Sequence, residues 1–175
     1  MLGKGVVPLP ISDDLAKLAL QEQALVLPHF DCDVAWRIGT TLRDLALQRK
    51  LGVAIDVRRF GQPLFYCALE GSTPNNPEWV RRKSNVVAHF FRSSYAVGLE
   101  LRQRKTDLLE KHGLPFSEFA AHGGSFPIRV EHAGVIGSVT VSGLPQRDDH
   151  ELVVEALCLE TRQDYATLRL PAQDW

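Results

Sequence analysis

The feature that most constrains the fold of this chain is the order in which two hydrophobic periodicities alternate along it. Two pairs of short strand-like segments, at 52–69 and 126–141, each have a turn in the middle and are typical of antiparallel hairpins. The segments before, between and after them follow the helical spacing of apolar residues. The βαβ alternation of a doubly wound sheet is absent from this pattern. The sequence therefore predicts an α+β fold, a single antiparallel sheet covered by helices in the order α-α-β-β-α-(α)-β-β-α.

Capping residues and apolar stripes set the expected bounds of the first two helices. Ser12 is a good N-cap for the first helix, which Pro28 ends. Asp31 or Asp33 caps the second helix. Apolar residues recur along that helix at the spacing of one buried face. This inner face is expected to consist of Val34, Ile38, Leu42 and Leu45.

The later helices are located by the same signals. Asn76 caps a third helix with Pro77 at its first position, and this helix is expected to run to about residue 93. Its apolar side is expected to consist of Trp79, Val80, Val86, Val87, Phe90 and Phe91. Thr106 caps a short helix that Gly113 ends. In the last helix, the inner face is expected to consist of Leu152, Val153, Ala156 and Leu159.

Composition places the chain among ordinary single globular domains. Its 175 residues are 45% hydrophobic and 23% charged, which allows a buried core without disulfides or metals. Residues 1–175 are predicted to form one domain, with an N-terminal arm at 1–11 and a C-terminal tail at 161–175. Three scattered cysteines with no CxxC pair predict no metal site and a reducing compartment. Without a signal peptide or a stretch of about 20 apolar residues, we expect a cytoplasmic protein that does not insert into membranes.

A formal net charge of −1 conceals a strongly basic segment between Trp79 and Lys105. The segment has one acid, Glu100, and seven bases: Arg81, Arg82, Lys83, Arg92, Arg102, Arg104 and Lys105. The near-neutral total excludes a chain that is basic throughout, and the aromatic residues here resemble core, so nucleic-acid binding is not expected. The local excess suits an anionic small molecule, such as a carboxylate, a phosphate or a haem propionate. A solvated helix face or a subunit contact would also explain it.

Two segments that contain glycine are further candidates for a binding site. His122-Gly123-Gly124 precedes a strand, and paired glycines allow a ligand to approach the backbone closely. The histidine could carry a proton or bind a metal. Segment 139–150 leads from a strand into a helix N-terminus, where free N–H groups favour an anion, and it ends with Asp149 and His150. The structural alternatives are a tight turn before a strand and a well-capped helix.

Four segments taken together resemble those of a known family in their order and spacing. They are residues 76–83 (NPEWVRRK), 92–98 (RSSYAVG), 122–127 (HGGSFP) and 141–146 (VSGLPQ), followed by Asp149 and His150. The chain resembles the GlcG/HbpS-like haem-degrading domain superfamily, in its branch of short stand-alone cytosolic proteins. The resemblance extends from about Leu15 to Glu160.

The resemblance implies an antiparallel sheet of the profilin or PAS kind, packed with helices, and homo-oligomers built from dimers. Some relatives in the superfamily bind haem, and others are appended to cobalamin-handling proteins. A fungal member of the closer branch is linked to delivery of tail-anchored membrane proteins. The site residues that the resemblance and the two glycine segments indicate are Arg82, Lys83, Arg92, Ser93, His122, Gly123, Gly124, Asp149 and His150.

Three functions remain open on this reasoning. The first is binding of a small ligand, with haem or a related anionic tetrapyrrole held by the basic helix and approached by His122 or His150. The second is a non-catalytic oligomeric adaptor, in which the same segments form interfaces and turns. The third is a small enzyme acting on an anionic metabolite, with one of these histidines as general base and Asp148 or Asp149 as the acid. No nucleophile, dinucleotide or Walker motif decides between them, and catalytic residues stay unassigned.

Overall fold

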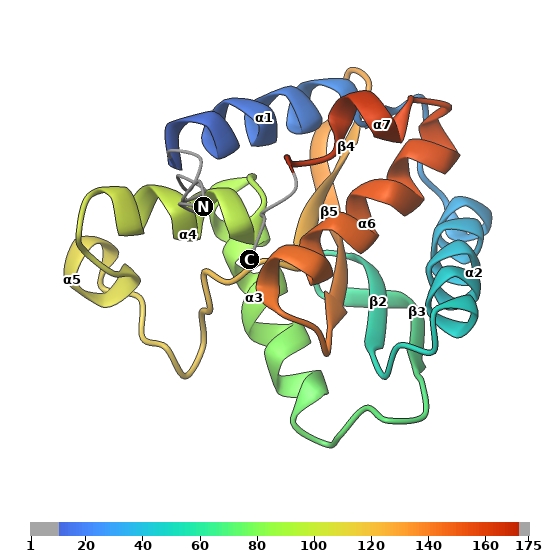
Figure 1. The fold of residues 1–175 in the computed structure, drawn as a ribbon, viewed down its shortest axis with the longest axis horizontal. Helices are drawn as coiled ribbons and strands as arrows, with labels where there is room; N and C mark the ends of the chain where they lie inside the picture. The colour runs from blue at the N-terminus through green and yellow to red at the C-terminus, as the bar shows by residue number, and fades with distance from the viewer. Residues whose placement is uncertain (1–10, 172–175) are drawn as a thin grey trace, which may run out of the picture.

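One five-stranded sheet organises the chain, with its strands in the order β1-β4-β5-β2-β3 (Figure 1). The computed structural model describes residues 11–171, so residues 1–10 of the predicted N-terminal arm lie outside the described part. The strands are β1 (Val26–Leu27), β2 (Ala54–Arg59), β3 (Gln62–Ala68), β4 (Ser125–Val130) and β5 (Gly134–Ser142). The helices are α1 (Ile11–Ala24), α2 (Cys32–Gln48), α3 (Asn76–Phe90), α4 (Ser94–Gln103), α5 (Leu108–His112), α6 (Gln146–Thr161) and α7 (Tyr165–Leu168).

The predicted α+β architecture, with one sheet covered by helices, is confirmed. Strand β2 pairs antiparallel with β3, β4 with β5, and β2 with β5, so the two hairpins join into one sheet. One pairing departs from the prediction, because β1 runs parallel to β4 with Val26 opposite Arg129. The sheet is therefore mixed. A strand of two residues is too short to show a period of two, which is why the sequence pattern does not reveal it.

Helix α4 is missing from the sequence prediction, which continues the third helix to residue 93. In the structure α3 ends at Phe90, and Phe91 adopts a left-handed conformation with φ 55°. Ser93 then caps α4 by accepting a hydrogen bond from the backbone N–H of Ala96 at 3.2 Å. Most of α4 is buried, so it lacks the contrast between an apolar and a polar face that marks a surface helix in a sequence.

Smaller differences lie at helix ends and on two expected core faces. Asp107, rather than Thr106, caps α5. Phe91 and Leu159 were expected on buried faces but are 49% and 59% exposed. Residues 161–171 of the predicted tail include α7, and the side chain of Leu170 is buried against the domain. Within residues 11–171, no helix combines the length and the apolar character that crossing a membrane requires.

The two faces of the sheet differ in chemistry. The face under α2 and α6 is part of the main apolar core and carries Ile55, Val57, Phe126, Ile128, Val139 and Val141. The alternate positions point toward α3, and their buried polar side chains are Asp56, Ser125, Ser138, Thr140 and Ser142. The hydroxyl groups of Ser125 and Thr140 are hydrogen-bonded to each other at 2.8 Å. Buried polar groups therefore gather between the sheet and α3.

A buried histidine and its glutamine partner link the helices α6, α1 and α7. His150 of α6 is completely buried, and its Nε2 lies 2.8 Å from Oε1 of Gln21 in α1. Because the amide nitrogen of Gln21 donates to the carbonyl oxygen of Leu168 at 2.8 Å, Oε1 is the acceptor and His150 Nε2 carries the proton. Nδ1 is buried without a partner among the described residues. Burial, together with the charge of Arg147, lowers the pKa of His150 from 6.5 to about 3.

The packing of α2 on β3 is expected to depend on a glycine. A Cβ added at Gly39 would lie 2.3 Å from the ring of Phe65, so Gly39→Ala must displace either the helix or the ring. We expect this substitution to lower the free energy of unfolding by about 1–3 kcal/mol in urea titrations. Gly61→Ala is the matched control, because a Cβ there meets nothing within 4 Å. Equal stability of the two variants would contradict the described packing.

The buried His150 predicts a loss of stability in mild acid. The unfolded chain takes up a proton at an ordinary histidine pKa of 6.5, whereas the folded protein resists it until about pH 3. The stability that His150 contributes is therefore complete above pH 6.5 and is lost as pH falls toward 3. Between pH 7 and pH 5 this amounts to about 2 kcal/mol. Urea unfolding at both pH values should show that His150→Gln removes this part of the pH dependence, and an unchanged pH dependence would refute it.

Candidate functional site

A buried ion pair lies where α3, β5 and the start of α6 meet. Nζ of Lys83 lies 2.7 Å from Oδ2 of Asp149 and donates to the carbonyl oxygen of Val141 at 3.2 Å. The other carboxylate oxygen of Asp149 accepts from the backbone N–H of Leu144 at 2.9 Å. Only 4% of the Lys83 side chain and 2% of the Asp149 side chain are exposed. The ion pair therefore joins α3 to the start of α6, and the bond to Val141 joins α3 to the end of β5.

Glycine is required beside this ion pair. Gly124 has φ +124°, a conformation that residues with a Cβ rarely adopt. A Cβ at this position would lie 2.4 Å from the carbonyl oxygen of Val141 and 2.7 Å from Nζ of Lys83. The paired glycines therefore let the strand β4 begin close against the lysine.

His122 stands next to these glycines in an aromatic setting. Its ring lies 5.3 Å from the ring of Trp79 and 6.0 Å from that of Phe116, measured between centroids. Nδ1 is buried and has no hydrogen-bond partner within the described residues. Burial lowers the pKa of His122, and the positive charges of Lys83 and nearby arginines lower it further. The imidazole is therefore neutral near pH 7.

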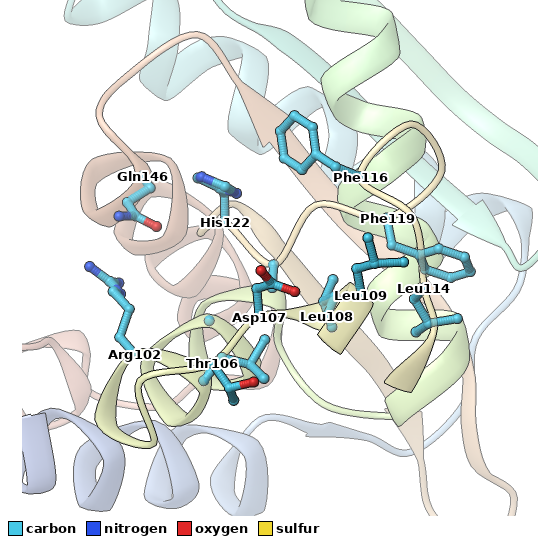
Figure 2. Close-up of a pocket in the computed structure, with 13 residues that line it drawn as sticks. Arg102, Thr106, Asp107, Leu108, Leu109, Leu114, Phe116, Phe119, His122 and Gln146 are labelled. Atoms are coloured by element: carbon cyan, nitrogen blue, oxygen red, sulfur yellow. The ribbon is translucent and has the colours of Figure 1, made fainter. Parts of the chain in front are cut away.

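One side of His122 faces a cavity of about 440 Å³ between α4, α5 and the segment before β4. Its lining is Gly98, Leu101, Arg102, Thr106, Asp107, Leu108, Leu109, Leu114, Phe116, Phe119, Ala121, His122 and Gln146. Figure 2 shows Arg102, His122 and Gln146 on one side of this cavity and Leu109, Leu114 and Phe119 on the other. We call it the α4–α5 cavity. Its walls combine an apolar surface with a few polar groups, as small-molecule sites usually do.

His122 also borders a second, smaller cavity of about 270 Å³. Its lining is Asn75, Asn76, Trp79, Lys83, His122, Ser142, Gly143, Leu144, Gln146 and Asp149. We call it the polar chamber. His122 and Gln146 border both cavities, and the Lys83–Asp149 ion pair contributes to the wall of the chamber alone.

The structure shows which bases of the segment between Trp79 and Lys105 have a partner within the protein. Arg81 is paired with Glu78 and Glu118, and Arg92 is paired with Glu22 and Glu100. Lys83 is neutralised by Asp149, and the guanidinium of Arg82 lies over the rings of Trp79 and Phe116 at 4.3 and 4.8 Å. Besides Arg82, the bases of the segment that form no ion pair within residues 11–171 are Arg102, Arg104 and Lys105. They lie together at the end of α4, and Arg102 also lines the α4–α5 cavity.

Five of the nine residues expected at the site come together in the structure. These are Lys83, His122, Gly123, Gly124 and Asp149, and Arg82 lies beside them against Trp79. Arg92, Ser93 and His150 border neither the α4–α5 cavity nor the polar chamber. Their roles here are an ion pair with Glu22 and Glu100, the cap of α4 and the buried contact with Gln21.

The sequence reasoning did not single out the apolar wall of the α4–α5 cavity. Leu109, Phe116 and Phe119 come from α5 and from the irregular segment between α5 and β4. An irregular segment has no period that could mark its apolar residues as lining. A signal was nevertheless present in the charge, since Arg102 belongs to the basic segment and now proves to border the cavity. Within the described residues, no group of three or more His, Cys, Asp or Glu side chains is arranged to hold a metal ion.

Known proteins share both the sequence and the fold. A UPF0303 protein of Paraburkholderia phymatum is 60% identical over 162 residues, which cover 93% of this chain and 98% of that protein. The crystal structure of Ybr137w superposes with a TM-score of 0.79 at 28% identity, covering 85% of this chain and 87% of that one. A PduOC–haem complex has a TM-score of 0.62 at 15% identity, covering 74% and 93%, and this similarity extends to the fold alone.

The family assignment depends on the extent of the match. The family described as "Haem degrading protein HbpS-like" matches residues 30–158, which include α2, both hairpins, the Lys83–Asp149 ion pair and His122. This chain belongs to the HbpS-like family.

Proposed function

We propose that the protein binds haem or a related anionic tetrapyrrole in the α4–α5 cavity. The observation that carries this proposal is the division of the cavity into an apolar wall and an edge on which Arg102 is the base, while the Asp107 carboxylate of the same lining caps α5 by accepting from the backbone N–H of Glu110. Leu109, Leu114 and Phe119 offer apolar surface, and Arg102 offers a positive charge without an ion-pair partner in residues 11–171. A ligand that is flat and apolar in its body and carries carboxylates at one edge matches this arrangement.

The residues around the cavity fit the requirements of haem. Arg102 would hold a propionate carboxylate, and the leucine and phenylalanine side chains would contact the macrocycle. His122 borders the cavity, and its lowered pKa keeps the imidazole in the neutral form that binds iron. Bound haem would supply iron chemistry, and the protein would hold the group and limit its contact with water. The haem complex of PduOC, a protein of the same fold, supports this choice of ligand class.

Exposed side chains at the cavity also support a bound partner of apolar character. Leu109 is 62% exposed and Phe116 is 55% exposed, and both line the cavity. A ligand covering them would remove apolar surface from water, which is favourable. The proposal includes the cytoplasmic location and the homo-oligomer built from dimers that the sequence resemblance implies.

The enzyme alternative has less support. His122 is neutral and could accept a proton, but Asp149, the expected acid, is buried and held by Lys83 and by the N–H of Leu144. Asp148 is exposed and borders neither the α4–α5 cavity nor the polar chamber. The adaptor alternative would explain the exposed Leu109 and Phe116 and could use Arg102 in a subunit contact, but it gives no role to the cavity that these residues line.

The proposal is tested by titrating the purified protein with haemin and following the Soret band. We expect a saturable shift, with Arg102→Ala weakening the Kd by about tenfold or more, because a charge-assisted hydrogen bond contributes about 1.5–3 kcal/mol. His122→Ala should alter the position of the Soret band by removing the imidazole. Arg43→Ala is the control, since Arg43 is exposed and does not line the α4–α5 cavity. The absence of a saturable shift, or equal affinity in Arg102→Ala and Arg43→Ala, would refute the proposal.

A further inference from the structure

The outer edge of strand β3 has no partner strand among the described residues. β3 is the last strand of the sheet, paired with β2 alone, and α2 packs beside it (Figure 1). The backbone N–H of Leu69 donates to the carbonyl oxygen of Val53 at 2.9 Å, which continues the β2–β3 ladder. In an antiparallel ladder, residues that bond to the neighbouring strand alternate with residues that do not. The N–H and C=O groups of Tyr66 and Ala68 therefore point away from β2, toward the outside of the sheet.

The usual protection of an edge strand covers only the first part of β3. Pro63 and the register shift opposite Val57 and Arg58 lie near its start, and both features discourage pairing there. From Phe65 to Leu69 the strand is in regular register and carries no charged side chain. We call residues 65–69 the β3 edge. A regular, uncharged edge of this kind is a template for another strand.

Exposed aromatic side chains lie beside the β3 edge. Tyr66 is 47% exposed, and Trp36 of α2 is 63% exposed with its ring 5.7 Å from that of Phe65, measured between centroids. They belong to a groove of about 510 Å³ between α2 and β3, whose lining is Trp36, Thr40, Arg43, Leu64, Phe65, Tyr66 and Cys67. The one charged residue of this lining, Arg43, is paired with Asp44 at 3.1 Å. A strand that pairs with the β3 edge would also cover apolar surface here.

Two charged residues at the ends of β3 indicate which strand complements it. Arg59 lies opposite Gln62 at the start of β3, and Glu70 follows the end of the strand. Neither forms an ion pair within residues 11–171. Antiparallel pairing with a second copy brings the Glu70 end of each strand to the Arg59 end of the other, whereas parallel pairing brings like charges together. A second copy of this chain, related by a twofold axis, therefore matches the edge in both charge and hydrogen bonding.

We propose that two copies of the chain pair antiparallel along their β3 edges, so that the two five-stranded sheets join into one continuous sheet. Tyr66 of each copy lies opposite Ala68 of the other, because this register uses all the outward N–H and C=O groups of both residues and leaves the irregular start of β3 outside the pairing. Cys67 then lies on the twofold axis, opposite Cys67 of the second copy. This inference rests on the homo-oligomer built from dimers that the proposed function includes, and it names the surface through which the dimer forms.

Oxidative cross-linking through the native Cys67 tests the register. Opposite residues of an antiparallel pair that exchange no hydrogen bonds have Cα atoms about 4.5 Å apart, a distance that a disulfide can bridge. In a Cys32→Ser chain, Cys67 remains as the partly exposed thiol and Cys158 is buried. We expect copper phenanthroline to produce a dimer linked through Cys67, which mass spectrometry identifies and which the further substitution Cys67→Ser removes. A yield of linked dimer no higher than in urea would overturn the proposal.

A proline substitution separates pairing from folding. Ala68→Pro removes an N–H that points outward, and proline is tolerated at such positions of an edge strand. We expect sedimentation velocity to give a dimer Kd at least about tenfold higher than for Ala68→Thr, which keeps the N–H, because the twofold axis removes two hydrogen bonds at once. If Ala68→Pro fails to fold, as judged by circular dichroism, Tyr66→Lys should weaken the dimer by bringing two like charges near the axis, whereas Tyr66→Phe should not.

The oligomeric state and haem binding are measured on the same samples. A chain that stays monomeric at every concentration, or a dimer that Ala68→Pro and Tyr66→Lys leave unchanged, would overturn the β3 pairing. Tyr66 and Ala68 do not line the α4–α5 cavity, so these variants should keep the Soret shift of the unsubstituted protein. Failure of the β3 pairing is therefore distinguishable from failure of haem binding.

Discussion

The contact between Lys83 and Asp149 joins the elements that form the polar chamber, and the start of α6 that it fixes also carries Gln146, which borders both cavities. Through it α3 is joined to the start of α6, and the bond from Nζ to the carbonyl oxygen of Val141 adds the end of β5. Breaking a buried pair by removing one partner leaves a charge without compensation, at a cost of about 3–5 kcal/mol. Gly124 lies against the same contact, with φ +124°, and a Cβ there would lie 2.4 Å from the carbonyl oxygen of Val141 and 2.7 Å from Nζ.

The polar face of the sheet explains why such a pair is tolerated in the interior. Between the strands and α3, Ser125 and Thr140 are hydrogen-bonded to each other, and Asp56 is held by Arg58 at 2.8 Å. An ion pair buried among groups that can orient their dipoles costs less than one surrounded by leucines and valines. The apolar core lies on the opposite face, under α2 and α6. The sheet thus separates the part that supplies most of the hydrophobic stability from the part that carries the chemistry.

Features determined by local sequence were predictable, and features determined by distant contacts were not. The two hairpins, a cap at Asp31 or Asp33 and the Gly123-Gly124 turn follow from periodicity and backbone preference, and the structure uses Asp31 as the cap. His150 was placed near the site because it follows Asp149, yet successive helical residues point in directions about 100° apart. Asp149 consequently contacts Lys83, while His150 contacts Gln21. Arg92 was expected beside a ligand, but Glu22, 70 residues away in the chain, is its partner, and no local pattern shows this.

The positive charge of the basic segment illustrates why a sequence count has to be corrected by structure. Four of its seven bases are engaged within the protein, three in ion pairs and Arg82 with the rings of Trp79 and Phe116. An ion-paired base adds little to the field felt by an outside anion, because its partner cancels the charge. Arg82 keeps its charge, and its guanidinium lies over the rings of Trp79 and Phe116. The remaining bases are adjacent at the end of α4, and only Arg102 reaches the cavity wall. The attraction for an anion therefore concentrates at one edge of one cavity, which favours a ligand whose charges also lie at one edge.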